Sequence, residues 1–332
     1  MTAPDLTVHI GRGARTGEAP PPGSGSRRAT PAMLMKNPVM LASGVFGYGD
    51  EFMGLAPYGE LGALVLKTVT LEPRLGNPPA SRTAETPSGM VNAIGLENVG
   101  MEAFLRDKLP VALSYGTHVV ASIAGDTPEE FAACARALDE AHVSAIELNI
   151  SCPNVKHGGM AFGVEAGASA EVVSAARGAT GKLLIAKLTP NVSDIAAIAS
   201  ACERAGADAV SLINTLSAMV IDVETRRPIL AANTGGLSGP AIRPVAVCRV
   251  FQVAQAVRIP VIGMGGIWNA SDALEFIVAG ASAVAVGTAL YADPAAGNRV
   301  LAGIHGYLER HQIASIGDLI GSVRLHDHYG VS

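Results

Sequence analysis

Short apolar runs alternate with longer Ala-rich segments along this 332-residue chain from residue 37 onward. The short runs are rich in Val, Ile and Leu and hold few polar positions, a pattern typical of strands buried on both faces of a parallel sheet. The longer segments carry apolar residues at helical spacing. The pattern predicts eight strands, each followed by a helical segment, at Pro38–Ser43, Ala63–Thr70, His118–Gly125, Ala145–Ser151, Leu183–Thr189, Ala209–Thr215, Pro260–Gly266 and Ala283–Thr288.

Eight such units predict an α/β fold, a single closed (β/α)8 TIM barrel. Ahead of it, apolar runs at Leu6–Ile10 and Met33–Met35 predict an N-terminal β-hairpin that caps the bottom of the barrel. The residues between these runs are rich in Gly, Pro, Ser and Arg, which predicts a flexible loop. The expected domains are residues 1–32, an N-terminal strand and loop, residues 33–320, the barrel, and residues 321–332, a C-terminal tail.

Polar residues gather where the predicted strands end. In this fold the active site lies at the carboxyl ends of the strands, and a chain selected only for a stable barrel has no reason to place its few strand-borne lysines and asparagines there. We therefore expect the site at this rim. The residues concerned are Ser43, Lys67, Ser122, Asn149, Lys187, Asn214, Thr215, Gly265, Gly266, Gly287 and Thr288.

Three charged residues are predicted to point into the barrel, because side chains two apart on a strand share a face. They are Lys67, Glu147 and Lys187. A lone buried carboxylate is costly, so Glu147 is expected to pair with a lysine, with Lys187 on the next strand as the first candidate. A shift of one residue in the strand phase would instead place Glu147 among the outer helices.

The fourth predicted strand ends in an amide and a thiol, at Asn149 and Cys152. Proline follows the cysteine, so the backbone there cannot simply continue the strand, and Cys152 becomes a candidate reacting group. The other cysteines, Cys134, Cys202 and Cys248, lie in Ala-rich helical patterns and are expected to be small buried hydrophobic residues. The four show no metal-ligand spacing, so no metal is expected.

Glycines follow the seventh and eighth predicted strands, at Gly265–Gly266 and Gly287–Thr288. Bare backbone amides beside helix starts at these two strands suit a phosphate group. The dinucleotide-binding pattern is not met, because Trp268 stands where a third glycine would follow Gly263 and Gly265. The glycines therefore predict a mononucleotide phosphate cup. Gly235–Pro240 is expected to add a third flexible segment near it.

The overall composition favours a small-molecule enzyme. The chain is 49% hydrophobic and 16% charged, and its net charge of -5 comes without a block of basic residues. Nucleic acid or an anionic membrane surface would need such a block. An apolar run long enough to span a bilayer and the apolar core of a signal peptide are both missing from the sequence. We therefore expect a cytoplasmic protein that binds neither nucleic acid nor membrane.

Taken together, these motifs resemble those of class 1 dihydroorotate dehydrogenase over about residues 34–320. The segment Val155–Gly159 and the run Gly44–Gly49 are most similar to the NAD-linked B-type catalytic subunit. The class 2 enzymes use serine as the base and carry an N-terminal membrane helix, and this sequence shows neither feature. The resemblance rests on Asn37–Gly49, Lys67–Thr68, Asn92–Leu96, Asn149–Asn154, Lys187–Asn191, Ile213–Thr215, Gly265–Gly266 and Gly287–Thr288.

The resemblance implies one FMN per chain and a substrate site on the face of the flavin. Orotate would contact Lys67, Asn92, Ala93, Ile94, Gly95, Leu96, Asn149, Asn214 and Thr215. The family usually has asparagine where this chain has Ser122, and the shorter side chain puts that flavin contact in doubt. FMN would be held by Ser43, Lys67, Thr68, Ser122, Asn149, Lys187, Ile213, Gly239, Gly265, Gly266, Gly287 and Thr288.

The implied reaction is the oxidation of (S)-dihydroorotate to orotate in UMP biosynthesis. Cys152 would remove a proton on the side opposite the flavin, which takes the hydride. Gly158, Gly159 and Gly163 offer hinges for a lid over the site, and His157 is taken as a bystander or lid contact. Because the chain lacks a cysteine cluster and a dinucleotide fingerprint, electrons would reach NAD through an accessory subunit carrying FAD and a [2Fe-2S] centre, and the resemblance also implies a homodimer.

Three other assignments remain open at this stage. One is an A-type, fumarate-linked dihydroorotate dehydrogenase. Another is an FMN-barrel reductase of a different uracil-like substrate, either a dihydropyrimidine or dihydrouridine in tRNA, although the acidic balance disfavours an RNA substrate. The last is a barrel without catalytic activity, which would leave the polar rim unexplained.

Overall fold

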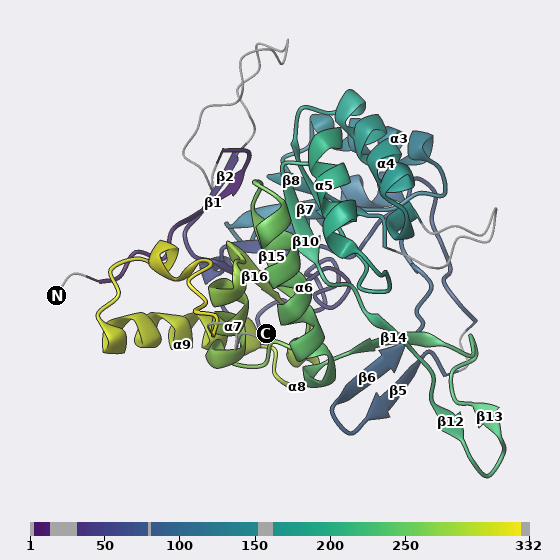
Figure 1. Cartoon of the computed structure of the whole chain (residues 1–332). Coiled ribbons are helices and arrows are strands. Elements are labelled where there is room, and N and C mark those ends of the chain that lie inside the picture. Colours follow the sequence, from purple (N-terminus) through teal and green to yellow (C-terminus); the bar gives the residue numbers. More distant parts are fainter. Residues whose placement is uncertain (1–2, 14–31, 79–80, 152–161, 327–332) are drawn as a thin grey trace, which may run out of the picture.

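The structure is a computed structural model that describes residues 3–13, 32–78, 81–151 and 162–326. Eight parallel strands close into a barrel in the order β10, β15, β16, β3, β4, β7, β8, β9, which confirms the predicted fold (Figure 1). The barrel strands are β3 (Val39–Leu41), β4 (Ala63–Val65), β7 (His118–Ile123), β8 (Ala145–Asn149), β9 (Leu183–Lys187), β10 (Ala209–Leu212), β15 (Val261–Met264) and β16 (Ala283–Val286).

Helices surround the barrel, and local sequence signals set several of their ends. Thr127 caps α3 by accepting a hydrogen bond from the Glu130 amide, and Asp194 caps α5, which stops at the left-handed Gly206. Among the described residues no helix has both the length and the apolar character needed to cross a membrane. The helices are α1 (Met101–Ala103), a π-helical turn (Phe104–Lys108), α2 (Leu109–Leu113), α3 (Pro128–Asp139), α4 (Ala166–Ala179), α5 (Ile195–Ala205), α6 (Arg243–Ala256), α7 (Ala270–Ala279), α8 (Ala289–Ala292) and α9 (Ala296–His311), with short 3-10 turns at Tyr58–Glu60, Phe162–Val164, Pro240–Ile242 and Ile316–Leu319.

The predicted N-terminal hairpin is confirmed as an antiparallel pair, β1 (Val8–Gly11) and β2 (Ala32–Met35). A ring nitrogen of His118, the first residue of β7, lies 2.8 Å from the carbonyl oxygen of Leu34. Arg12 also donates to the Ala207 carbonyl at 2.8 Å, just before β10 begins. The hairpin therefore caps the amino-end face of the barrel. Most of the loop between its strands, residues 14–31, lies outside the described residues.

Several strands end earlier than the sequence pattern predicts. Strand β4 stops at Val65 instead of Thr70, and β10 stops at Leu212 instead of Thr215. At Lys67 the backbone amide donates to the carbonyl of Gly47 at 2.8 Å, in the loop after β3, and so leaves the ladder with β7. Lys67, Asn214 and Thr215 thus belong to loops, which frees their side chains to face the space above the barrel, whereas Asn149 and Lys187 are the last residues of β8 and β9.

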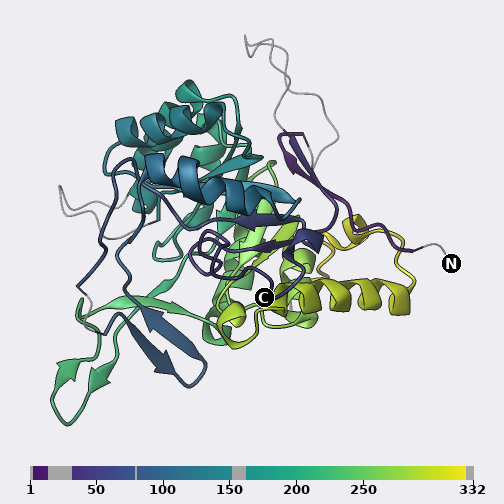
Figure 2. The ribbon, with the colours of Figure 1, turned by 180° about the vertical axis from the view of Figure 1, so that it is seen from behind.

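A second sheet was not predicted. It is antiparallel, in the order β11, β14, β6, β5, and a small hairpin of β12 and β13 projects beyond it, at the opposite end of the barrel from β1 and β2 in both views (Figures 1 and 2). Its middle strand β14 reads Gly-Gly-Leu-Ser, which has little intrinsic preference for a strand, so the expected flexible segment is wrong here. The bounds are β5 (Thr83–Thr86), β6 (Gly89–Asn92), β11 (Leu216–Ala218), β12 (Ile221–Asp222), β13 (Arg227–Pro228) and β14 (Gly235–Ser238).

The three described cysteines divide by burial. Cys134 in α3 and Cys202 in α5 are buried, as expected, and burial raises the pKa of each thiol to about 12. Cys248 in α6 is exposed, so its predicted burial is wrong. The helical pattern around Cys248 indicated a helix correctly but did not identify which face of that helix packs on the barrel.

Candidate active site

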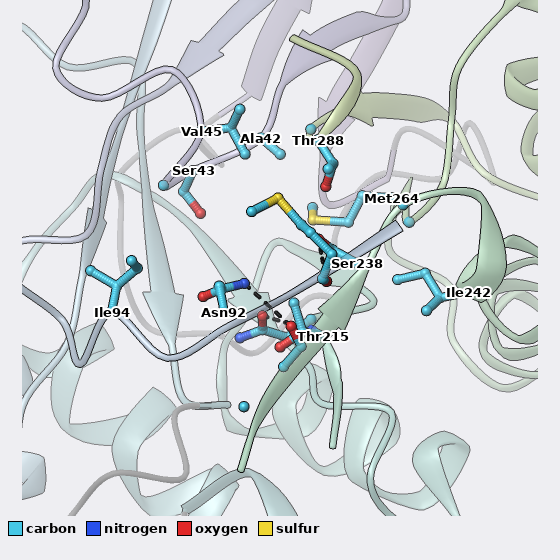
Figure 3. Close-up of a pocket in the computed structure, with 18 of the residues that line it drawn as sticks. Ala42, Ser43, Val45, Asn92, Ile94, Thr215, Ser238, Ile242, Met264 and Thr288 are labelled. Atoms are coloured by element: carbon cyan, nitrogen blue, oxygen red, sulfur yellow. Dashed lines mark hydrogen bonds between the residues drawn. The ribbon is translucent and has the colours of Figure 1, made fainter. Parts of the chain in front are cut away.

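A cavity of about 450 Å³ lies between the carboxyl-end rim of the barrel and the antiparallel sheet. Figure 3 shows Ala42, Ser43 and Thr288 across the cavity from Asn92, Thr215 and Ser238. Within the described residues, every side chain or glycine expected to bind FMN or orotate lines this cavity, with the exception of Ser122. The structure therefore brings together residues from seven of the eight barrel strands or the loops that follow them, and from β6; within the described residues β7 contributes none.

Two asparagines of the cavity wall are linked through a serine that the sequence reading missed. Ser151 Oγ donates to Asn149 Oδ1 at 2.8 Å and accepts from Asn214 Nδ2 at 2.5 Å. Asn214 Oδ1 in turn accepts from the backbone amide of Thr215 at 2.8 Å. These bonds orient both amide groups and leave each with part of its hydrogen-bonding capacity for a ligand. Ser151 stands two residues after Asn149, so the period of two was the signal that pointed to it.

Ser122 lies one layer behind the cavity wall. Its hydroxyl is 2.9 Å from that of Thr68, and Asn149 Nδ2 donates to Thr68 Oγ1 at 3.1 Å. Ser122 is 1% exposed and does not line the cavity. Its observed partner is thus Thr68, so Ser122 supports a side chain that faces the cavity.

The predicted ion pair between Glu147 and Lys187 is not formed. Glu147 does point into the barrel, but its carboxylate accepts from Ser43 Oγ at 2.9 Å and from Ser211 Oγ at 3.0 Å. Lys187 Nζ donates to the same Ser43 hydroxyl at 3.0 Å. Among the described residues Glu147 has no basic partner within 4.0 Å, because the hydroxyl of Ser43 stands between the two charges.

Lys67 differs from Lys187 in having its ammonium free. In the described part of the chain Lys67 Nζ makes no hydrogen bond or ion pair. The other charged residues of the cavity lining are Lys187 and Glu97, and Glu97 is paired with Arg82. The uncommitted charge that the described lining offers a ligand is therefore positive, which favours an anion.

A loop with left-handed backbone forms another part of the wall. Gly95 and Leu96 have φ angles of 79° and 56°. The backbone amide of Asn77 donates to the Ile94 carbonyl at 2.9 Å, and its side-chain amide donates to the Ala93 carbonyl at 2.8 Å. A Cβ on Gly95 would lie 2.6 Å from the Asn77 nitrogen. Asn77 therefore holds this loop in a shape that requires glycine.

The glycine cup lies at the ends of β15 and β16. Gly265 and Gly266 have φ angles of 127° and 75°, and a Cβ on Gly266 would lie 2.7 Å from the carbonyl oxygen of Gly239. Within the described residues the backbone amides of Gly265, Gly266, Gly287 and Thr288 have no hydrogen-bond acceptor. All four line the cavity. Unpaired amides that converge on one space form an anion-binding concavity.

The start of α7 does not contribute to this cup. Asn269 and Asp272 form a capping box, and Asp272 Oδ2 accepts from the backbone amides of Trp268 and Asn269 at 2.9 and 3.1 Å. Asp272 is itself paired with Arg243 at the start of α6. The expected phosphate binding by this helix start is therefore replaced by an internal cap, and the cup consists of the glycine segments.

Comparison with known proteins identifies the family of this chain. The family model for dihydroorotate dehydrogenase matches residues 29–308. The chain belongs to the dihydroorotate dehydrogenase family. It is 55% identical over 293 residues, 88% of this chain and 96% of the relative, to a protein of Trichlorobacter lovleyi named dihydroorotate dehydrogenase B (NAD(+)), catalytic subunit. A protein of Geotalea daltonii with the same name is 52% identical over 326 residues, 98% of this chain and 100% of the relative.

A solved structure supports the family's barrel fold. The crystal structure of DHODH from Eimeria tenella in complex with ferulenol matches with a TM-score of 0.72, covering 87% of this chain and 86% of that one. Sequence identity is 22%, so this likeness concerns the fold alone. The fold and the family agree: the chain is an oxidoreductase of the dihydroorotate dehydrogenase family on a TIM barrel.

The candidate base of this dihydroorotate dehydrogenase, Cys152, lies outside the described residues, as do His157, Gly158 and Gly159. The residue before it, Ser151, lines the cavity. After the gap, the amide of Gly163 donates to the Ile150 carbonyl at 2.9 Å, which joins the two ends of the segment. The described residue next to Cys152 in the sequence thus lies at the cavity wall.

Part of the lining of this family member's cavity was missed from the sequence. The second sheet contributes Met90, Gly235, Gly236 and Ser238, and the loop after β9 contributes Asn191. Asn191 Nδ2 donates to the Thr215 carbonyl at 3.0 Å. The sheet itself was not predicted, although Gly235–Pro240 was expected near the glycine cup and Asn191 belongs to the Lys187–Asn191 motif, so Met90 is the residue without a sequence signal.

Proposed function

We propose that this member of the dihydroorotate dehydrogenase family oxidises (S)-dihydroorotate to orotate, a step of UMP biosynthesis, with one FMN bound in the rim cavity. The observation that carries the proposal is that one cavity combines two kinds of binding group. Within the described residues its lining holds four unpaired backbone amides, which suit an anion, and the free Lys67 ammonium together with oriented amide side chains. A flavin mononucleotide and a planar pyrimidine carboxylate together require these two kinds of site.

The glycine cup fits the phosphate of FMN. A Cβ at Gly239 or Gly266 would fall 2.7 Å from neighbouring backbone, so glycine at these positions lets the backbone segments around the cup pack closely. Ser43, Thr68, Lys187 and the backbone near Ile213 would hold the flavin ring against the barrel. When bound, FMN supplies the acceptor for the hydride that leaves the substrate.

The substrate would meet Lys67 and the asparagines. The Lys67 ammonium has no partner among the described residues, so it is available to the substrate carboxylate without breaking an existing contact. Asn92, Asn149 and Asn214 each carry both a donor and an acceptor, which matches the alternating N–H and C=O edge of a pyrimidine. The loop Ala93–Leu96 would close the remaining side through its backbone.

We infer that Cys152 takes the proton from the substrate carbon next to the one that loses the hydride. The role is supported by Ser151, the described residue before Cys152, which lines the cavity. A thiolate at that position needs water excluded and a support for its charge, which a closed loop over the cavity would provide. The proton and the hydride would then leave on opposite faces of a flat ring.

The electron acceptor is inferred from the relatives. Those described above are named as B-type, NAD(+)-linked catalytic subunits. We propose that this chain likewise passes electrons to NAD through an accessory subunit with FAD and a [2Fe-2S] centre, and that it forms a homodimer in the cytoplasm. An isolated chain that reduces fumarate would instead support the A-type alternative.

One experiment tests the reaction. The purified chain, reconstituted with FMN, is mixed with dihydroorotate under anaerobic conditions while the visible flavin spectrum is recorded. We expect the yellow colour to bleach and orotate to form in a one-to-one ratio with the flavin. Bleaching by a dihydropyrimidine but not by dihydroorotate would overturn the proposed substrate, and a chain that does not retain FMN would overturn the proposed cofactor.

The acceptor is tested separately. The isolated chain is supplied with NAD, fumarate, quinone or oxygen in turn, and turnover of dihydroorotate is measured with each. We expect negligible NAD reduction by the isolated chain and NAD reduction when an accessory subunit from a B-type relative is added. Efficient fumarate reduction would contradict the B-type proposal but leave the dehydrogenase reaction intact.

A further inference from the structure

One buried carboxylate has no part in the reaction described above. Glu147 is 1% exposed, lies in the middle of β8 and does not line the cavity. A buried ionised group is expensive unless its charge is compensated, so its retention inside the barrel requires a reason. Its hydrogen bonds to Ser43 and Ser211 satisfy both carboxylate oxygens but supply no positive charge.

The single hydroxyl proton of Ser43 fixes the direction of the two hydrogen bonds that link Lys187 to Glu147. A serine hydroxyl has one proton, and Ser43 donates it to Glu147 Oε1, because an ionised carboxylate can only accept. Towards Lys187 the hydroxyl must therefore accept, and Lys187 Nζ must donate. The three groups form a directed chain, ammonium to hydroxyl to carboxylate. Both ends are nearly sealed from solvent, since Lys187 is 5% exposed.

The hydrogen-bonded groups Lys187, Ser43 and Glu147 lie at different depths behind the cavity surface. Ser43 and Lys187 line the cavity, whereas Glu147 and Ser211 lie behind them. The charged residues of the described lining are Lys67, Glu97 and Lys187, and Glu97 is paired with Arg82. On the strands beside β9, β8 presents Glu147 and β10 presents the uncharged Ser211. In the described residues Glu147 is therefore the negative charge coupled to Lys187.

We propose that Glu147 is a positioning residue that acts through Ser43 to hold the Lys187 ammonium at the cavity wall, and thereby sets the preference of the site for reduced over oxidised flavin. The inference rests on the proposed function, because it assumes FMN at this wall. An ammonium in a low-dielectric cavity stabilises the negative charge of reduced flavin. Without the carboxylate, the charge-assisted bond that fixes Ser43 becomes a weaker neutral one, Lys187 is held less firmly at the wall, and that stabilisation is reduced.

The test is the midpoint potential of the bound FMN in Glu147→Gln, measured by equilibration with reference dyes. Glutamine retains the size and hydrogen-bonding capacity of glutamate but not its charge. We expect the preference for reduced flavin to fall about tenfold, equivalent to about 30 mV for a two-electron couple. The matched control is Glu129→Gln, which removes a carboxylate from the exposed side of α3 and should leave the potential unchanged.

The sign of the shift discriminates between explanations. A negative charge that acted on the flavin directly would, on removal, raise the potential. A residue that only filled space would leave the potential unaltered. Either result in a folded, FMN-loaded Glu147→Gln protein would overturn the proposal.

A double-mutant cycle covers the case in which Glu147→Gln does not fold. Lys187→Gln and the double variant Glu147→Gln, Lys187→Gln are compared, the double variant having lost both charges together. If Glu147 acts only through Lys187, the two proteins have the same potential. A further shift in the double variant would overturn the inference. If the wild-type chain fails to bind FMN, the proposed function fails, whereas a normal wild type with an unshifted Glu147→Gln refutes this inference alone.

Discussion

The two inward lysines of the rim, Lys67 and Lys187, lie in contrasting surroundings. Lys187 belongs to the barrel wall, is almost fully buried and is bound to Ser43, behind which Glu147 lies. Lys67 belongs to a loop that leaves the barrel ladder, is half-buried, and has a free ammonium within the described residues. The Lys187 ammonium is thus bonded within the protein before any ligand binds, whereas Lys67, proposed to meet the substrate, retains an unmatched charge within the described residues.

The same difference extends to the elements around them. The barrel wall is built of strand ends tied to one another by side-chain hydrogen bonds. The substrate side is built of a left-handed loop and short strands that are tied largely through backbone carbonyls, as with Asn77 and the Ala93–Leu96 loop. The contrast teaches that one cavity can hold both a cation oriented in advance by internal bonds, Lys187, and a cation left free to pair with a ligand, Lys67.

The largest expected effect comes from removing the proposed base. Cys152→Ala should keep FMN and orotate binding but lose turnover by roughly a hundredfold or more, because general base catalysis contributes about 10²–10⁴-fold. Cys152→Ser should retain a little activity at high pH. Stopped-flow reduction of the flavin by dihydroorotate measures the step. Turnover equal to wild type in the alanine variant would remove Cys152 from the mechanism.

The next effect tests the free ammonium. Lys67→Met should weaken orotate binding by roughly tenfold to a hundredfold, since a hydrogen bond to a charged group contributes about 1.5–3 kcal/mol. The melting temperature should hardly change, because Lys67 has no partner to lose among the residues that the structure describes. Lys187→Met is the matched comparison and should lower the melting temperature, since it leaves Glu147 without its coupled charge. Equal thermal losses in the two variants would break the comparison between these lysines.

A third prediction concerns the glycine cup. Gly266→Ala introduces a Cβ 2.7 Å from the Gly239 carbonyl and a strained left-handed φ, so FMN affinity should fall by about tenfold, in line with a backbone penalty of about 1–3 kcal/mol. Gly178→Ala in α4 is the control, because its Cβ would meet open space and should not harm FMN binding. Fluorescence titration with FMN measures both. Retained affinity in Gly266→Ala would place the phosphate elsewhere.

The smallest effect is expected at the loop support. Asn77→Ala removes the side-chain bond to the Ala93 carbonyl but leaves the backbone bond to Ile94, so the KM for dihydroorotate should rise about three- to fivefold, consistent with a net hydrogen-bond contribution of about 0.5–1.5 kcal/mol. FMN affinity and kcat should stay constant. A fall in kcat with constant KM would show that the loop acts on the reaction instead of on binding.

Prediction from the sequence succeeded where the pattern was local and repeated. Eight buried runs separated by helical segments leave few alternatives to a barrel, and the rule that chemistry lies at the carboxyl ends then selected the rim residues that now line one cavity. It failed where local propensity is weak. The strand Gly235–Ser238 contains two glycines, so its pairing with β6 and β11 depends on neighbours distant in the chain. The predicted burial of Cys248 was wrong for a similar reason, because helical spacing does not reveal how a helix is rotated against the barrel.

Periodicity and residue type in the amino-acid sequence were by themselves sufficient for the barrel, the N-terminal hairpin and the inward direction of Glu147, since side-chain direction alternates strictly along a strand. Only the tertiary structure decided which side chains Glu147 and Lys187 contact. Ser43 comes from a strand end more than a hundred positions away from both charges, and it separates Glu147 from Lys187 because barrel closure brings β3, β8 and β9 around one interior. No local sequence pattern encodes which side chains become neighbours in space. The expected ion pair is therefore replaced by two charged groups that are bridged by the Ser43 hydroxyl.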